Sequence, residues 1–170
     1  MSIVQASDFA GKYNISQNVH TVKDLDLYIE RYEKVYLIDL LGCELYELFI
    51  ADLTATTPQT SQNSPYTEIF NEFCIDDECK IIKSEGIKQM LIDFIYFEYV
   101  RDQNYKNTIS GTVKSNTEVS ELVSPTFLDT IFNEAIETYW AIQFFICENS
   151  IDYPTYNGQY KRKTSWIWYL

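Results

Sequence analysis

Apolar residues recur at helical spacing along the first half of the chain and predict two consecutive helices. Thr21 is suited to cap the first helix, with Asp24 reaching back to complete a capping box. Gly42 is suited to end it, because glycine adopts the left-handed conformation found just beyond many helices. The apolar residues expected to face the core of this helix are Leu25, Ile29, Tyr32, Tyr36 and Leu40. A second helix is expected behind Gly42, with Leu45, Leu48, Phe49 and Leu53 on one stripe.

The middle of the chain alternates between polar and apolar segments. Residues 54–65 have no charges and little apolar character, which predicts a solvated loop. Residues 66–73 predict a short helix, and residues 74–83 show no clear period. Ser84 is suited to cap a third helix that runs to about Asn104. Its apolar stripe is wider than one face, so we expect it to be buried on more than one side.

Residues 108–123 are rich in Thr, Ser and Val with rough alternation, which predicts a projecting β-hairpin or a long loop. Ser115-Asn116 is suited to form the turn of such a hairpin. A disordered connection is the alternative for this segment.

Ser124-Pro125 predicts the start of the last helix, with a cap followed by proline at the first helical position. A regular stripe follows, made of Leu128, Ile131, Phe132, Ala135, Tyr139, Ile142 and Ile146. Trp140, Phe144 and Phe145 lie off this stripe. The far end of the helix therefore carries more apolar surface than we expect a small bundle to cover.

Residues 152–170 have neither helical nor strand period, yet they carry a basic triplet, Lys161-Arg162-Lys163, before a strongly aromatic end. Burying a large apolar side chain stabilises by about 1.5–3 kcal/mol, whereas ordering a residue costs about 1–2 kcal/mol. We therefore expect an arm that docks, either on its own domain or on another subunit.

These segments predict a mainly α fold, a small bundle of four to five helices with a protruding β-hairpin or long loop. The helical domain is expected over residues 1–151, with the insertion at about 108–123, followed by the docking arm at 152–170. The length of 170 residues suits one domain with a core that needs no staples.

Composition and charge narrow the class of protein. The formal net charge is −12, and three of the thirteen basic residues lie in the terminal triplet. Such an acidic body repels phosphate backbones, so specific nucleic-acid binding is not expected. No run approaches a membrane-spanning length, and no signal peptide precedes the four cysteines, which predicts reduced, buried or half-buried thiols.

Residues suited to chemistry are scattered. His20 is the only histidine and stands beside no acid or nucleophile. Cys74 and Cys79 do not have the spacing of a zinc knuckle, and no phosphate-binding glycine motif is present. Glu134 and Glu137 fall on an ordinary helix surface. The sequence therefore nominates no catalytic, metal or cofactor-binding residue.

The chain resembles the head–tail connector proteins (adaptor or neck ring proteins) of tailed bacteriophages, in particular those of phages of Bacteroidetes hosts, including crAss-like phages. The resemblance covers nearly the full length and rests on the order and spacing of several segments. They are residues 6–12 (ASDFAGK), Leu40-Leu41-Gly42, residues 45–49 (LYELF), 86–91 (GIKQML), 94–102 (FIYFEYVRD), 107–111 (NTISG), 139–149, 152–156 and Gly158. The basic triplet and the final WIWYL have no place in the family pattern.

The resemblance implies a ring of about twelve copies beneath the portal, with DNA passing through the centre without specific binding. The expected partners are other copies of the chain, the portal, and tail or further neck proteins, with no membrane. The expected location is the neck of the virion, after synthesis in the host cytoplasm. We expect the interface residues to be Ile109, Val113, Val119, Trp140, Phe144, Tyr153, Tyr156, Trp166, Trp168, Tyr169 and Leu170. An intracellular protein-binding or regulatory module without catalysis is the alternative, and a small enzyme with an unrecognised site is a third.

Overall fold

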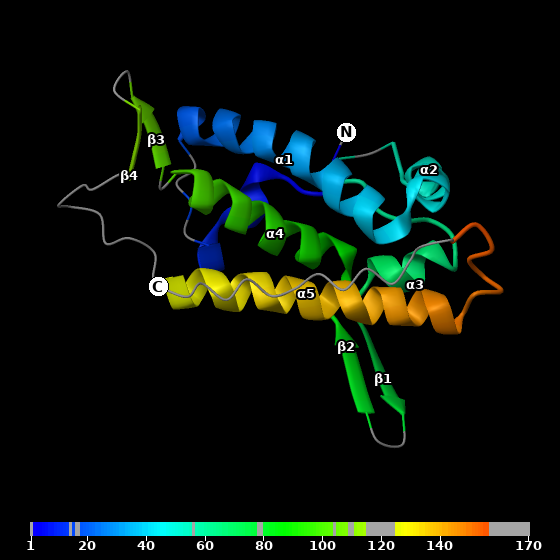
Figure 1. The fold of residues 1–170 in the computed structure, drawn as a ribbon. Helices are drawn as coiled ribbons and strands as arrows, with labels where there is room; N and C mark the ends of the chain where they lie inside the picture. The colour runs from blue at the N-terminus through cyan, green and yellow to red at the C-terminus, as the bar shows by residue number, and fades with distance from the viewer. Residues whose placement is uncertain are drawn as a thin grey trace.

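In the part of the chain that the computed structural model describes, five α-helices form the body (Figure 1), which confirms the mainly α expectation. The structure describes residues 2–13, 15, 18–55, 57–77, 80–103, 105–108, 111–114 and 125–156. The helices are α1 (Val19–Leu41), α2 (Cys43–Asp52), α3 (Tyr66–Phe70), α4 (Gly86–Gln103) and α5 (Pro125–Glu148). Two short 3-10 turns, Ala6–Phe9 and Gly11–Tyr13, precede them.

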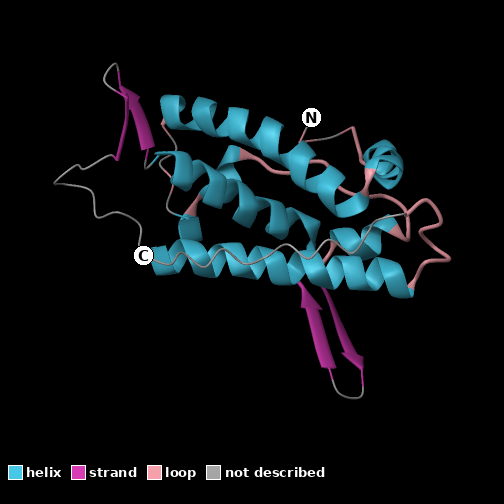
Figure 2. Cartoon of the chain, viewed as in Figure 1, coloured by secondary structure: helices cyan, strands magenta, loops and turns pink. Residues whose placement is uncertain are grey.

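Two antiparallel hairpins account for the described strands and stand out from the helices (Figure 2). The first joins β1 (Phe73–Asp77) to β2 (Lys80–Ser84), and the second joins β3 (Tyr105–Thr108) to β4 (Gly111–Lys114). β2 runs directly into α4, and β3 follows directly after it. The hairpins therefore lie at opposite ends of α4, which spans about 27 Å.

Helix α4 forms the centre of the core and packs against both α1 and α5. Every residue from Met90 to Glu98 is buried, which confirms that this helix is covered on more than one side. On the α1 side, the ring of Tyr36 stacks on that of Phe94 at 4.2 Å, and the Tyr36 hydroxyl donates to Glu98 at 2.7 Å. The predicted stripe of α5 is buried throughout, from Leu128 to Ile146.

The start of α1 lies three residues earlier than the capping box predicts. Asn18 is the cap, and its side-chain oxygen accepts hydrogen bonds from the backbone N–H groups of His20 and Thr21 at 3.1 and 2.9 Å. Thr21 lies inside the helix because an asparagine three residues before it satisfies the same free N–H groups. The end of α1 at Gly42 is as predicted, with a φ of 76°.

Two other boundaries differ from the sequence prediction. The short helix ends at Phe70, and Phe73 belongs to β1. In the second hairpin, Thr108 pairs with Gly111, so the chain reverses between these two residues and Ser115-Asn116 is not the turn. The predicted insertion at 108–123 is therefore a hairpin that begins earlier, at Tyr105, while residues 115–124 lie outside the described residues.

The N-terminal segment belongs to the core, with Ile3, Val4 and Phe9 fully buried. Glu33, a buried carboxylate of α1, accepts hydrogen bonds from the backbone N–H groups of Ile3 at 3.1 Å and Val4 at 3.2 Å. The carboxylate thereby holds the start of the chain against α1.

Candidate interaction surfaces

The β1–β2 hairpin has one face on the body and one in solvent. Residues that pair across the hairpin share a face, and Cys74 pairs with Lys83 and Asp76 with Ile81. All four are exposed, and Ile81 has 72% of its surface exposed. On the opposite face, Ile82 and Ser84 are buried. The sequence left this segment unassigned because its strands are only five residues long.

The β3–β4 hairpin contains Val113 in β4, opposite Lys106. Ile109 and Val119, the other interface residues predicted near this segment, lie outside the described residues. A two-stranded hairpin is marginally stable by itself, so a projecting hairpin gains stability from whatever packs on it.

Aromatic residues off the stripe of α5 are partly covered by the chain itself. Trp140 and Phe144 are half-buried. Phe145 packs against Phe73 of β1 with ring centroids 4.9 Å apart, and against Tyr153 at 6.4 Å. The sequence-based expectation of surplus apolar surface at this end is therefore too high, because β1 and the turn after α5 cover Phe145.

Tyr153 is a core residue, which corrects its expected place in an interface. Its side chain is 1% exposed, and its hydroxyl donates to the backbone oxygen of Pro65 at 2.9 Å. Tyr156 is half-buried against the same core, and burial raises its pKa to about 12. The first residues of the predicted arm thus fold back onto their own helices.

The remaining interface residues predicted in the arm are outside the described residues. They are Trp166, Trp168, Tyr169 and Leu170. Their role stays a prediction.

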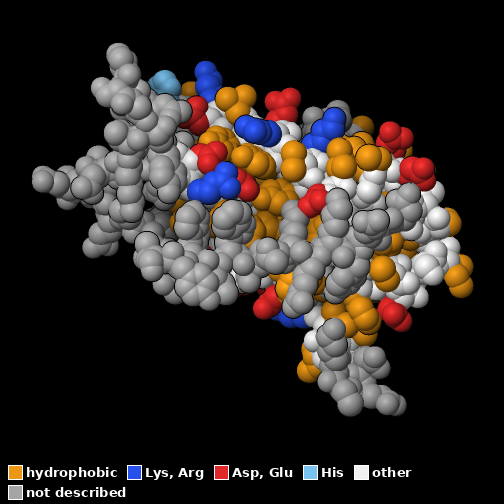
Figure 3. Space-filling model, viewed as in Figure 1, with side chains coloured by type: hydrophobic (Ala, Val, Ile, Leu, Met, Phe, Trp, Pro, Cys, Tyr) orange, Lys and Arg blue, Asp and Glu red, His pale blue; other side chains and the backbone are white. Residues whose placement is uncertain are grey.

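Large apolar side chains are exposed at several positions, and one of them, Leu48, corrects the sequence analysis, which placed it on the apolar stripe of the second helix. The described ones are Val19, Leu27, Val35, Leu48, Ile81, Phe127 and Ile151. Of these, Leu27 and Val35 lie on α1 among lysine and arginine side chains, and Figure 3 shows orange and blue side chains together over this helix. The sequence could have identified Leu27 and Val35 as exposed, because both lie on the outer, polar face of an otherwise regular amphipathic helix.

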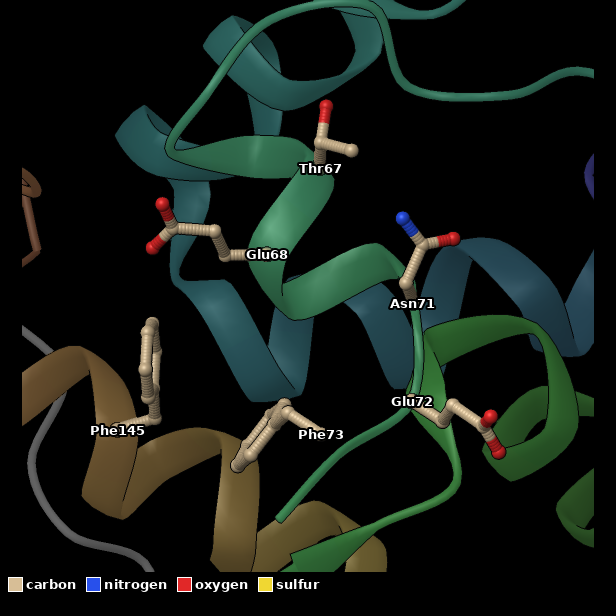
Figure 4. A pocket seen from close by; sticks show the side chains of 6 residues that line it. All are labelled: Thr67, Glu68, Asn71, Glu72, Phe73 and Phe145. Carbon is tan, nitrogen blue, oxygen red and sulfur yellow. The ribbon is translucent and has the colours of Figure 1, made fainter. Parts of the chain in front are cut away.

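An open hollow of ≈ 400 Å³ lies where α3, β1 and the end of α5 meet. Its lining residues are Thr67, Glu68, Asn71, Glu72, Phe73 and Phe145. Figure 4 shows the two phenylalanine rings side by side, with Glu68 on the Phe145 side and Glu72 on the Phe73 side. The hollow thus combines an aromatic floor with an acidic rim, which suits a cationic and apolar ligand surface.

A polar cluster centred on the buried Asp93 joins the N-terminal segment to α4 and α5. The hydroxyl of Tyr13 donates to Asp93, which is 1% exposed, and Gln89 donates to the Tyr13 oxygen at 2.6 Å. Lys12 lies 3.7 Å from Asp93 and 2.8 Å from Glu134. Burial raises the pKa of Asp93 to about 6, against the hydrogen bond from Tyr13 and the charge of Lys12. These contacts hold three elements together.

Other titratable and thiol groups are spread over the described surface. Cys43, Cys74 and Cys147 are free and exposed, so the expectation of buried or half-buried thiols is wrong for these three. The reason is that each lies on the outward side of its helix or strand. Among the described residues, no group of three or more His, Cys, Asp or Glu side chains could hold a metal ion.

None of the described helices combines the length and the apolar character needed to cross a bilayer.

Comparison with known proteins gives one match. The family described as "Family of unknown function (DUF6712)" matches residues 37–165, which is more than half of the chain. No curated protein and no solved structure matches the chain. The matched range begins within α1 and includes both hairpins and α5.

Proposed function

We propose that the chain, which belongs to the DUF6712 family of unknown function, is a structural subunit of the neck of a tailed bacteriophage. In this role, about twelve copies form a ring that joins the portal to the tail. DNA passes through the ring without specific binding, and the subunit has no catalytic role.

The observation that carries this proposal is the placement of the two hairpins. They leave the body at opposite ends of α4, and α4 is buried along its length between α1 and α5. A helix packed on several sides is rigid, so it fixes the separation and orientation of the two hairpins. Two contact elements held apart by a rigid body suit a protein that joins a component above it to one below it.

The resemblance to connector proteins falls on residues with defined structural tasks. Gly42 separates α1 from α2, and Gly86 begins α4, each with a positive φ. Residues 94–102 form the buried centre and the end of α4. The similar segments are thus the ones that set the directions of the helices and hairpins, which supports a shared architecture.

Charge supports the same role. A net charge of −12 makes the surface repel DNA, so a ring of such subunits lets packaged DNA slide through. The proposed ring would have the portal on one side and tail or neck proteins on the other. The proposed location is therefore the virion neck.

The test is to mix the purified chain with the portal ring of the same phage and to measure the mass of the product by light scattering. We expect a complex that contains one ring of the chain per portal, and electron microscopy should find the added density at the exit of the portal. A chain that stays monomeric and ignores the portal would instead fit the regulatory module, and the connector proposal would fail.

A further inference from the structure

The outer face of α1 carries a stripe in which apolar and basic side chains lie together. We define the α1 stripe as Lys23, Leu27, Arg31, Lys34 and Val35. Each lies three or four residues from another member, so the five share a helix face. All five are exposed, with Leu27 at 65% and Val35 at 51%. Such exposure of large apolar side chains is costly unless another surface covers them.

The charges of this stripe are not satisfied within the described part of the chain. Neither Lys23 nor Lys34 forms an ion pair with a described carboxylate. Arg31 lies over the ring of Tyr32, 5.2 Å from its centroid. Leu27, at its centre, has Lys23 and Arg31 four residues away and Asp24 and Glu30 three residues away, so this face carries three cations and two carboxylates. In a chain with thirteen basic and twenty-five acidic residues, such a grouping is unusual.

The hollow between α3, β1 and α5 offers the opposite chemistry. Its floor is Phe73 and Phe145, and its rim is Glu68 and Glu72, both exposed. No lysine or arginine is among the described residues that line it, and neither glutamate pairs with a described cation. Figure 3 shows blue and red side chains together over α1, with further red ones toward the α2 end.

We propose that the α1 stripe of one copy docks into the acidic hollow of a second copy. Leu27 and Val35 would cover the phenylalanine floor, while Lys23, Arg31 and Lys34 would meet Glu68 and Glu72. Complementary charges of this kind set the register and exclude wrong partners. The occupant of the hollow is therefore α1 of another copy of this chain.

This contact cannot form within one copy. The opposite face of α1 is packed into the core through Leu25, Ile29 and Leu37, so the stripe faces outward and stays there. The contact therefore joins two different surfaces of neighbouring copies. Such head-to-tail contacts generate closed rings or open filaments. The inference deepens the proposed ring by naming its lateral contact, and it rests on that proposal for the closure of the ring.

Charge reversal tests the pairing directly. Variant A carries Lys23→Glu and Lys34→Glu, and variant B carries Glu68→Lys and Glu72→Lys. Each variant alone places like charges in contact, so we expect its self-association to be at least about tenfold weaker than that of the natural chain. In an equimolar mixture, A and B alternate and every contact is again complementary, so association should return. Light scattering and sedimentation measure the mass in each case.

Matched controls separate this contact from a general effect of charge. Glu44→Lys with Glu47→Lys changes the net charge as variant B does, on the exposed face of α2. Lys83→Glu, on the β1–β2 hairpin, changes the net charge by the same amount as the single variant Lys34→Glu. The comparison of these two variants is the control for the basic side. We expect both controls to associate like the natural chain. Equal weakening by the controls, or no recovery in the mixture of A and B, would overturn the proposal.

Chemical cross-linking gives a second readout that does not depend on a stable ring. A carbodiimide joins a lysine amine to a carboxylate in contact, and mixing isotope-labelled with unlabelled chains identifies links between copies. We expect links from Lys23 or Lys34 to Glu68 or Glu72. Their absence at millimolar concentration, whether the chain is monomeric or linked through other faces, would show the proposal to be wrong.

The outcomes separate this inference from the neck function. A ring found at the portal with lateral contacts elsewhere would overturn the pairing and keep the function. Paired copies that never join the portal would keep the pairing and overturn the function.

Discussion

At the scale of single residues, Glu33 fixes the N-terminal segment through its carboxylate. The backbone N–H groups of Ile3 and Val4 have no strand or helix partner and donate to Glu33 instead. Hydrogen bonds to a charged group contribute about 1.5–3 kcal/mol.

Glu33→Gln places an amide where only an acceptor fits. We expect a loss of about 2 kcal/mol in the free energy of unfolding and faster proteolysis before residue 10. Glu30→Gln, on the exposed side of the same helix, should change neither.

Asp93 makes the stability depend on pH. Burial raises its pKa to about 6 in the folded protein, from about 4 in an unfolded chain. Between these values the folded protein holds a proton that the unfolded chain has lost. The free energy of unfolding therefore falls as pH rises through this window and is level above it. Tyr13 and Gln89 donate hydrogen bonds to the carboxyl and Lys12 lies 3.7 Å from it, which lowers its pKa. The charge of Glu134 on α5 raises it, and burial outweighs the lowering contacts.

The variant Asp93→Asn has no such proton to lose. Relative to the natural chain, we expect it to gain up to about 3 kcal/mol of stability between pH 4 and pH 7, measured by urea unfolding. Glu137→Gln, an exposed carboxylate of α5, is the control and should show no such trend. If the free energies of unfolding of Asp93→Asn and the natural chain differ by a constant amount across this range, Asp93 is not the source of the pH dependence.

At the scale of elements, Gly86 sets the junction between β2 and α4. Its φ is +85°, and a Cβ there would lie 2.6 Å from the backbone oxygen of Phe70 and 2.9 Å from the backbone carbon of Asn71. The end of α3 can therefore pack against this junction only if residue 86 has no side chain. The glycine thereby fixes where the first hairpin leaves the body.

We expect Gly86→Ala to lower the free energy of unfolding by more than the 1–2 kcal/mol or so that a left-handed alanine costs by itself. Gly11 is the matched control, since its φ is +71° and nothing lies within 4 Å of a built Cβ. Gly11→Ala should therefore show only the conformational cost. Thermal or urea unfolding of both variants checks this, and equal losses would mean that the contact with α3 has no effect.

At the scale of the whole molecule, the C-terminal segment is predicted to serve assembly and not folding. Tyr153 and Tyr156 complete the core before residue 157. Deleting residues 159–170 should therefore leave the helical body folded, with unchanged circular dichroism, while association with the portal or with other copies weakens at least about tenfold through lost avidity. A truncated chain that unfolds would place the segment in the core and end the idea of an assembly arm.

The helices were predictable because their signals are local. Pro125 marks the start of α5 and Gly42 the end of α1, and the spacing of apolar residues identified the faces that are buried. Errors arose where two local signals compete, as with Asn18 and Thr21 for the same N–H groups. The β1–β2 hairpin was missed because a five-residue strand has too few alternations to stand out from a short helix.

The candidate surfaces were less predictable than the fold. Trp140 and Phe144 were singled out correctly as lying off the buried stripe, but Tyr153 could not be separated from them by its type or spacing. The hydroxyl of Tyr153 donates a hydrogen bond to the backbone oxygen of Pro65, which is eighty-eight residues away in the sequence. The acidic hollow likewise brings Glu68 and Phe145 together from distant parts of the chain.

The sequence by itself determined the helices, their buried faces and the acidic character of the chain, because these depend on neighbours within a few turns. Only the tertiary structure decided which apolar side chains the chain covers for itself and which it leaves exposed. That division depends on how α1, α4 and α5 pack and on where the hairpins leave the body. Packing of this kind is a property of pairs of surfaces, and no single segment contains it.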